Sequence, residues 1–371
     1  DNQLNLSVTY ADATNIDVEP QTANYLRNLT INHASCVATL QRNLIVKDKI
    51  NVNNGELNCG SVNISSELAN LEISSSNTAA KLDFGDNTVN EGRLGESNGS
   101  IGKIEGGSSG SIAVNKTGNL RIIDFGSGAV VTGTVNLIYK GNNNSSSVSQ
   151  DLRCSSGSGN VRLEVNAVNN TDIVKTNATT SIGGLTITKG VFDPNSSPFT
   201  LTGVGLVCGP DSGSADTGKF NAGSSDCTFV SGSTSGKGLH VRQGGTFDGG
   251  SGTHTMGSIV VDNNSAAKFT NTSDTTTVNG HSNDSTRSIL IATNSVCVAA
   301  GTMDLTYGTA SNIQCGNAAG INNLTLTGNV TYTQSDNLLM SGNLLVTSGT
   351  TLSTANYNLT AVLVYGNGTI N

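Results

Sequence analysis

The chain has 371 residues, of which 35% are hydrophobic, 4% aromatic and 12% charged, and its formal net charge is −8. The charged fraction is about half of that in an average soluble domain, and 45 glycines together with Asn, Ser and Thr supply the polarity instead. The Lys and Arg residues form no basic stripe, which argues against nucleic acid binding, and the longest apolar run is too short to span a membrane.

Residues 1–27 alternate apolar and polar positions and predict a strand segment that serves either as a cap or as a donor strand for another subunit. The sequence begins at Asp1 rather than Met, for which we expect removal of a secretion signal; cleavage during virion maturation and trimming of the chain are the alternatives. This expectation places the protein outside the cell or on its surface.

Residues 28–371 predict a single all-β domain. β-branched residues and Leu alternate with Ser, Thr and Asn over most of this range, as in strands that bury one face. Only residues 65–73 are considered for a helix, and their LEI ending fits a strand equally well. None of the four prolines lies beyond Pro210, which suits uninterrupted strand ladders because proline removes a backbone donor.

Seven cysteines occur, and six of them form three successive pairs whose members are about twenty residues apart. If one coil of the fold has that length, the members of a pair lie on adjacent strands at disulfide distance. This spacing predicts the bridges Cys36–Cys59, Cys208–Cys227 and Cys297–Cys315 in an oxidising compartment, and buried free cysteines are the alternative. Cys154 is left unpaired, either buried or available for a cross-link to another subunit.

Asn-x-Ser/Thr sequons are numerous. They predict N-glycans on a secreted surface, or they follow from the suitability of Asn and Thr for turns and ladders. The candidate asparagines are Asn5, Asn28, Asn63, Asn98, Asn115, Asn143, Asn144, Asn169, Asn177, Asn195, Asn263, Asn271, Asn283, Asn323, Asn329, Asn358 and Asn367.

Two GxSxG matches, around Ser97 and Ser108, are followed by no helix, so neither fits a nucleophile elbow. The four histidines have no zinc-site spacing, and we predict neither a metal nor a cofactor. They are His33, His240, His254 and His281.

Parallel β-helices include polysaccharide lyases and hydrolases, which need clustered carboxylates or a basic residue beside a metal. The nearest candidates are Asp83 with Asp86 and Asp211 with Asp216, and neither forms an Asp-Asp pair. Turn formation and weak calcium binding are the simpler interpretations. The sequence therefore predicts that the protein is not an enzyme.

The last fifty residues repeat with a period of about twenty. Residues 323–342 align above residues 343–362 and 363–371, with three short apolar pieces per unit separated by turn residues. The alignment places Leu324 over Leu344 and Val364, Leu326 over Val346, Tyr332 over Leu352, Leu339 over Leu359, and Val330 over Ile370. Such a period predicts a parallel β-helix, or β-solenoid, with three short strands in each coil.

Phrases such as GGLTITKGVFD and GNLLVTSGTTLSTANYNLTAV make residues 181–371 resemble extracellular β-solenoid surface proteins and adhesins of prokaryotes. Similar stretches occur in structural proteins of some phages. The resemblance implies a passive rod, and it carries no functional residue over to this chain.

The pattern stops at VLVYGNGTIN with no recognisable cap, and an uncovered strand edge recruits other strands. We therefore expect a structural subunit of an extracellular filament or cell-surface coat that joins copies of itself end to end. The alternatives are an adhesin or phage fibre that binds glycans and, less favoured by the sequence, a polysaccharide lyase or hydrolase.

Overall fold

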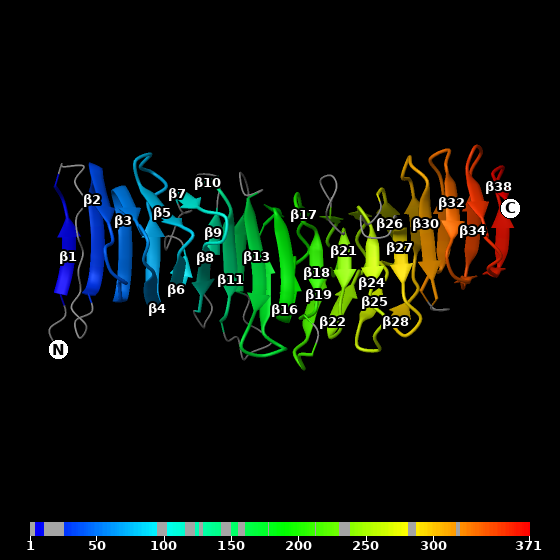
Figure 1. Ribbon diagram of the computed structural model, residues 1–371, viewed down its shortest axis with the longest axis horizontal. Coiled ribbons are helices and arrows are strands. Elements are labelled where there is room, and N and C mark those ends of the chain that lie inside the picture. Colours follow the sequence, from blue (N-terminus) through cyan, green and yellow to red (C-terminus); the bar gives the residue numbers. More distant parts are fainter. Residues whose placement is uncertain are drawn as a thin grey trace. The chain divides into compact units, whose positions relative to one another are not determined.

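The fold is all-β, as the sequence predicts. A computed structural model describes residues 4–10, 26–94, 102–115, 123–125, 129–141, 150–154, 160–176, 178–211, 213–229, 238–280, 287–316 and 320–371. These residues contain strands and no helix, and parallel ladders stack the strands as a β-solenoid (Figure 1). The chain divides into two compact units, Asp1–Ile182 and Gly183–Asn371.

Three parallel ladders build the N-terminal unit. The first contains β1 (Leu4–Val8), the starts of β2 (Leu26–Thr39) and β3 (Val46–Asn58), the end of β4 (Ile64–Ile73), β6 (Thr88–Leu94), β9 (Ile123–Phe125), β12 (Gln150–Cys154) and β14 (Ile173–Thr176). The second contains the ends of β2 and β3, β5 (Lys81–Gly85), β7 (Lys103–Gly106) and β10 (Val130–Thr132). The third contains the starts of β4 and β6, β8 (Ser111–Val114), β11 (Val135–Tyr139) and β13 (Val161–Asn166). The last strand of this unit is β15 (Thr180–Ile182).

Three parallel ladders also build the C-terminal unit. The first contains the start of β16 (Gly184–Asp193), β18 (Leu206–Cys208), β21 (Leu239–Val241), β24 (Ile259–Val261), β27 (Arg287–Ile291), β30 (Ser311–Cys315), β32 (Thr331–Gln334), β35 (Thr351–Ser353) and β38 (Thr369–Ile370). The second contains the end of β16, β19 (Gly218–Asn221), β22 (Gly245–Asp248), β25 (Lys268–Thr270) and β28 (Val296–Val298). The third contains β17 (Phe199–Leu201), β20 (Cys227–Phe229), β23 (His254–Met256), β26 (Thr275–Val278), β29 (Thr302–Leu305), β31 (Asn323–Leu326), β34 (Asn343–Val346) and β37 (Leu363–Tyr365). A shorter pairing joins β33 (Leu338–Leu339) to β36 (Leu359–Thr360).

The twenty-residue period holds in the last coils. Leu324 pairs with Leu344, and Leu344 pairs with Val364. Leu326 pairs with Val346, and Tyr332 with Leu352, which confirms these four alignments. Elsewhere the coil length varies, because Leu206 pairs with Leu239 whereas Leu239 pairs with the much nearer Ile259.

Two of the predicted alignments are wrong. Leu359 pairs with Leu338 rather than with Leu339, because it is Leu338 that turns inward and is buried. Ile370 pairs with Leu352, which lies above Tyr332 and not above Val330. The segment from Tyr365 to Thr369 is two residues shorter than the segment from Leu345 to Thr351 with which its ends pair, and this shortening shifts the register of the last strand.

Alternation along each strand places the core inside the coils. In β5, Leu82 and Phe84 are buried while Lys81 and Asp83 are half-buried on the outer face. In the C-terminal unit the inward positions of successive coils hold an aromatic column of stacked rings whose centroids are 5.8, 5.7 and 5.7 Å apart. Its members are Phe192, Phe220, Phe247 and Phe269. A fixed register explains the column, because residues at the same rung stack from coil to coil.

The structure divides the chain between Ile182 and Gly183, whereas the sequence predicted one domain over residues 28–371. Within the expected N-terminal segment, β1 pairs in parallel with β2 in the N-terminal unit, and residues 1–3 and 11–25 lie outside the described residues. Residues 65–73, the only stretch considered for a helix, lie in β4.

Candidate functional site

The final coil of the C-terminal unit exposes its apolar side chains. Val364 is 44% exposed and Ile370 is 39% exposed, although they pair with Leu344 and Leu352, which are fully buried. Leu363 and Val362 beside them are more exposed still. Positions that form the core in each preceding coil therefore lie on the surface in this one, close to the C-terminus labelled in Figure 1.

The backbone of this final coil also offers a strand edge. β37 is the edge strand of its sheet, and β38 pairs with β35 on one side. The N–H groups of Thr369 and Asn371 donate to the coil beneath, at Thr350 O and Leu352 O. Edge strands usually carry charged residues or proline that block pairing with other strands, yet residues 337–371 contain neither. This edge is therefore suited to pairing with another strand.

β1 offers a second uncharged edge, in the N-terminal unit. Its sequence LNLSV contains no charged residue, and Leu4 is 61% exposed while Val8 is buried against the next coil. Asn28 Nδ2 donates to Asn5 Oδ1 at 2.8 Å, so that β1 and β2 are joined by side chains as well as by the backbone ladder. Among the described residues, each unit thus contains a strand edge of this kind with exposed apolar side chains.

Two of the three predicted cysteine pairs do not lie on adjacent strands of one ladder. Cys208 pairs in register with Ile187 and Val241, whereas Cys227 belongs to a different ladder. Cys297 and Cys315 are likewise on different ladders, in β28 and β30. The reason is that loops make these coils longer than the gaps between the cysteines.

Cys36 and Cys59 are out of register on neighbouring coils. An added Cβ at Gly55 would lie 3.4 Å from Cys36 Cβ, so Cys36 lies beside Gly55, four residues before Cys59. These two cysteines and the four of the preceding paragraph are buried, and no disulfide bridge joins any of them within the part of the chain that the structure describes. Burial raises the pKa of the Cys59 thiol to about 12, which suppresses the reactive thiolate. The side chain of Cys154 lies outside the described residues.

The structure separates the sequons by accessibility. Exposed asparagines are Asn5, Asn63, Asn195, Asn263, Asn329, Asn358 and Asn367, and half-buried ones are Asn28, Asn115, Asn169 and Asn323. Asn271 is wrong as a glycan site because it is only 2% exposed and its Nδ2 donates to Ala300 O at 2.9 Å. Five candidates lie outside the described residues, namely Asn98, Asn143, Asn144, Asn177 and Asn283.

The GxSxG serine at position 108 lies in a turn. Ser108 Oγ donates to Asp86 Oδ1 at 3.3 Å, and the backbone N–H of Ser109 donates to the same oxygen at 2.8 Å. These contacts, the Ser109 N–H first, lower the pKa of Asp86. Asp86 therefore anchors a turn, as expected of a loop carboxylate, and Ser97 lies outside the described residues.

The histidines are spread over separate places. His33 Nδ1 accepts from Ser35 N at 3.3 Å, and His240 Nε2 lies 2.8 Å from Asp262 Oδ1. His254 is fully buried beside Gly249 O, and burial lowers its pKa. His281 lies outside the described residues. Within the described ranges no group of three or more His, Cys, Asp or Glu residues is placed to hold a metal ion.

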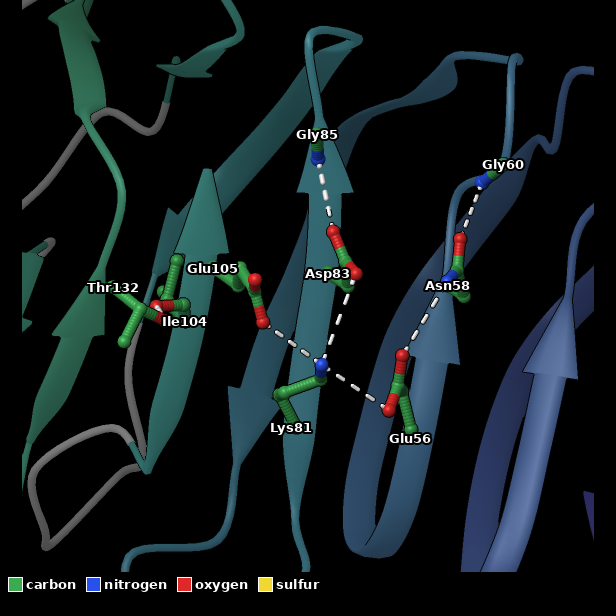
Figure 2. Close-up of polar contacts among 9 residues, drawn as sticks. All are labelled: Glu56, Asn58, Gly60, Lys81, Asp83, Gly85, Ile104, Glu105 and Thr132. Carbon is green, nitrogen blue, oxygen red and sulfur yellow. Dashed lines mark hydrogen bonds and ion pairs between the residues drawn. The ribbon is translucent and has the colours of Figure 1, made fainter. Parts of the chain in front are cut away.

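Asp83 belongs to a charged cluster on the outer face of the second N-terminal ladder. Figure 2 shows Lys81 reaching between carboxylates of the neighbouring strands. Its Nζ lies 2.9 Å from Glu105 Oε2, 3.2 Å from Glu56 Oε2 and 3.8 Å from Asp83 Oδ2. One ammonium thus serves three carboxylates contributed by three coils.

Burial and repulsion act together on this cluster. Burial disfavours a charge on Lys81, but its contacts with Glu105 and Glu56 outweigh burial and raise the pKa of Lys81. The pKa of Asp83 is also raised, first by burial and then by repulsion from Glu105 and Glu56, although Lys81 opposes the change. Lys81 is therefore the residue that keeps three carboxylates together on this face.

We expect Lys81→Met to lower the free energy of unfolding by about 1–2 kcal/mol, because it leaves three carboxylates without their shared cation. The matched control is Lys219→Met, which removes a single pair with Asp248 at 3.2 Å and should cost about 0.5 kcal/mol. Urea unfolding of both variants at low and high salt measures the difference. Equal losses for the two variants would contradict a cluster held by Lys81.

The second pair of candidate carboxylates is also divided between different cations. Asp211 pairs with Arg242, whereas Asp216 lies 3.1 Å from Lys189 Nζ and accepts from Ser214 Oγ at 3.0 Å. The structure therefore engages each of these aspartates in an ion pair of its own.

Two features of the structure were not predicted from the sequence. The first is a polar groove of about 370 Å³ in the C-terminal unit, lined by Pro210, Asp211, Arg242, Gln243, Asp262, Asn263 and Asn264. The second is Glu91, a fully buried carboxyl whose two oxygens have no hydrogen-bond partner among the described residues. The pattern TVNEGRL could have suggested it, because Glu91 shares its strand face with the apolar Val89.

The fold and these sites define the class as a parallel β-solenoid. The chain matches no protein-family model, and no significant match is found among curated proteins or solved structures. A search of the described residues for a helix long and apolar enough to cross a membrane finds none.

Proposed function

We propose that the protein is a structural subunit of an extracellular filament or cell-surface coat, in which copies join end to end by stacking coil on coil. The observation that carries this proposal is the exposure of Val364 and Ile370 on a coil whose neighbours beneath are fully buried. Covering these side chains removes apolar area from water, which is the main favourable term in association.

The proposed partner surface is β1 of a second copy. An uncharged β37–β38 edge pairs with the uncharged β1 edge, and their backbone groups continue the parallel ladder from one copy to the next. Because the two edges differ, the contact is heterologous and propagates as an open filament rather than closing into a dimer. The three-ladder coil supplies the stiffness of such a subunit.

Several features support a passive role outside the cell. The candidate carboxylates are engaged separately in ion pairs and turns, and exposed sequons occur in both units. Low charge combined with exposed sequons is consistent with a secreted surface protein. An adhesin or fibre that binds glycans is the second candidate, and the polar groove of the C-terminal unit favours it.

Analytical ultracentrifugation and negative-stain microscopy of the full chain under native, non-reducing conditions test the proposal. We expect unbranched polymers whose length increases with protein concentration. Monomers at every concentration would overturn it.

A further inference from the structure

The polar groove of the C-terminal unit is formed by equivalent turns of three successive coils. Pro210 and Asp211 follow β18, Arg242 and Gln243 follow β21, and Asp262 begins the turn after β24. These three strands are neighbours in the first C-terminal ladder. The groove therefore runs along the stacking direction and spans about 10 Å from the first coil to the third.

Hydrogen bonds hold the carboxylate and guanidinium side chains of the groove in place. His240 is 7% exposed, and its Nε2 lies within hydrogen-bond distance of Asp262 Oδ1, at 2.8 Å. Asp211 pairs with Arg242 Nη1 and so holds one side of the guanidinium. Arg242 itself lines the same groove, and its guanidinium has further N–H donors besides the one bound to Asp211.

The two asparagines are held in the same manner. Asn263 Oδ1 accepts from Asn294 N at 3.1 Å, and Asn264 Oδ1 accepts from Ala266 N at 2.8 Å. With its carbonyl oxygen bound to the backbone, the Asn264 amide offers its Nδ2 hydrogens to a ligand. Side chains fixed in advance lose little entropy on binding, so a groove of this kind is pre-organised.

From this arrangement we propose that the groove binds a neutral saccharide chain. Amide and guanidinium donors alternate with carboxylate acceptors, which matches hydroxyl groups that each donate and accept. Two aspartates against one arginine give the lining a net negative charge, which disfavours an anionic ligand. The volume of about 370 Å³ lies within the range of about 300–1,000 Å³ for small-molecule sites.

The length of the groove sets the form of the ligand. Polar groups repeated on three coils can contact successive units of a linear saccharide chain. A single sugar would contact only some of these groups. Carbohydrate binding at this groove does not rest on end-to-end assembly, since the groove uses turns of one unit and leaves the final coil free.

Saturation-transfer NMR with the full chain tests the proposal, using neutral linear tri- and tetrasaccharides, uronate oligosaccharides and calcium chloride as probes. We expect at least one neutral saccharide to bind. Asp262→Asn keeps the shape and removes an acceptor, and Gln243→Ala removes an amide at the middle turn. Each should weaken binding about tenfold. Asp248→Asn, on the second C-terminal ladder outside the groove, is the matched control and should leave binding unchanged.

Thermal unfolding of the three variants separates a binding defect from a folding defect. Binding by no neutral saccharide would overturn the proposal and leave a purely structural set of polar turns. Binding restricted to uronates or to calcium would overturn it as well, as would equal affinity of Asp262→Asn and the unaltered protein.

Discussion

Val364→Lys is expected to abolish assembly into polymers. Val364 occupies a core position of the last coil and is 44% exposed, and in a stacked copy it would be covered by the next coil. An ammonium at that position must lose its hydration when the coils meet, and without a partner this cost exceeds the gain from apolar burial. In the separate subunit the lysine stays in water, so the free energy of unfolding should change by about 0.5 kcal/mol or less.

The matched control is Val130→Lys. Val130 lies on β10 of the N-terminal unit, and its side chain is 46% exposed, close to the value for Val364. Because it belongs to no proposed contact, this variant should sediment like the unaltered protein. Polymers of normal length from Val364→Lys would show that the final coil is not the joining surface.

Glu91→Gln is expected to stabilise the protein at neutral pH. Glu91 is fully buried on β6, and burial raises its pKa well above the ordinary value. Buried Arg93 lies two positions further along the strand, but the carboxyl oxygens of Glu91 accept no hydrogen bond from it. The folded protein therefore favours the protonated acid, and ionisation at this place costs free energy.

The sign of the pH dependence follows from proton binding. Below the ordinary glutamate pKa of about 4.3 both the folded and unfolded states are protonated, so Glu91 carries no penalty. As the pH rises towards the folded pKa, the unfolded chain loses its proton and the folded chain keeps it, and stability falls. Each unit of pKa difference costs about 1.4 kcal/mol once the pH exceeds both values.

Urea unfolding at pH 4, 6 and 8 measures this effect. The difference between Glu91→Gln and the unaltered protein should be small at pH 4 and should widen in favour of the variant at pH 6 and 8. Glu164→Gln, which replaces a half-buried carboxylate on the outer face of β13, is the control and should show no widening. A constant difference across this range would contradict a protonated Glu91.

The sequence predicted the fold class and most of the register of the last coils, because there the period is short and the loops are minimal. Leu324, Leu344 and Val364 stack as their alignment predicts. Alternation also identified the buried face of strands such as β5. Repeated local patterns are therefore sufficient where each coil has the same length.

Long-range neighbours could not be predicted where loop lengths vary. Leu206 pairs with Leu239, whereas the next coil runs only from Leu239 to Ile259, so a fixed gap does not identify a fixed neighbour. Because the coils differ in length, the spacing of the cysteines did not predict which strands are neighbours. The polar groove could not be predicted for the same reason, because its residues come together only when the turns after β18, β21 and β24 stack on one another.

The contact between copies can be tested directly by photocrosslinking. A benzophenone side chain replaces Tyr365, which is 48% exposed on β37. A mixture of isotopically light and heavy copies is then irradiated, and the linked peptides are identified by mass spectrometry. End-to-end stacking predicts links between light and heavy copies that join β37 to residues 4–10. Links confined to single copies, or directed to any other surface of a second copy, would contradict it.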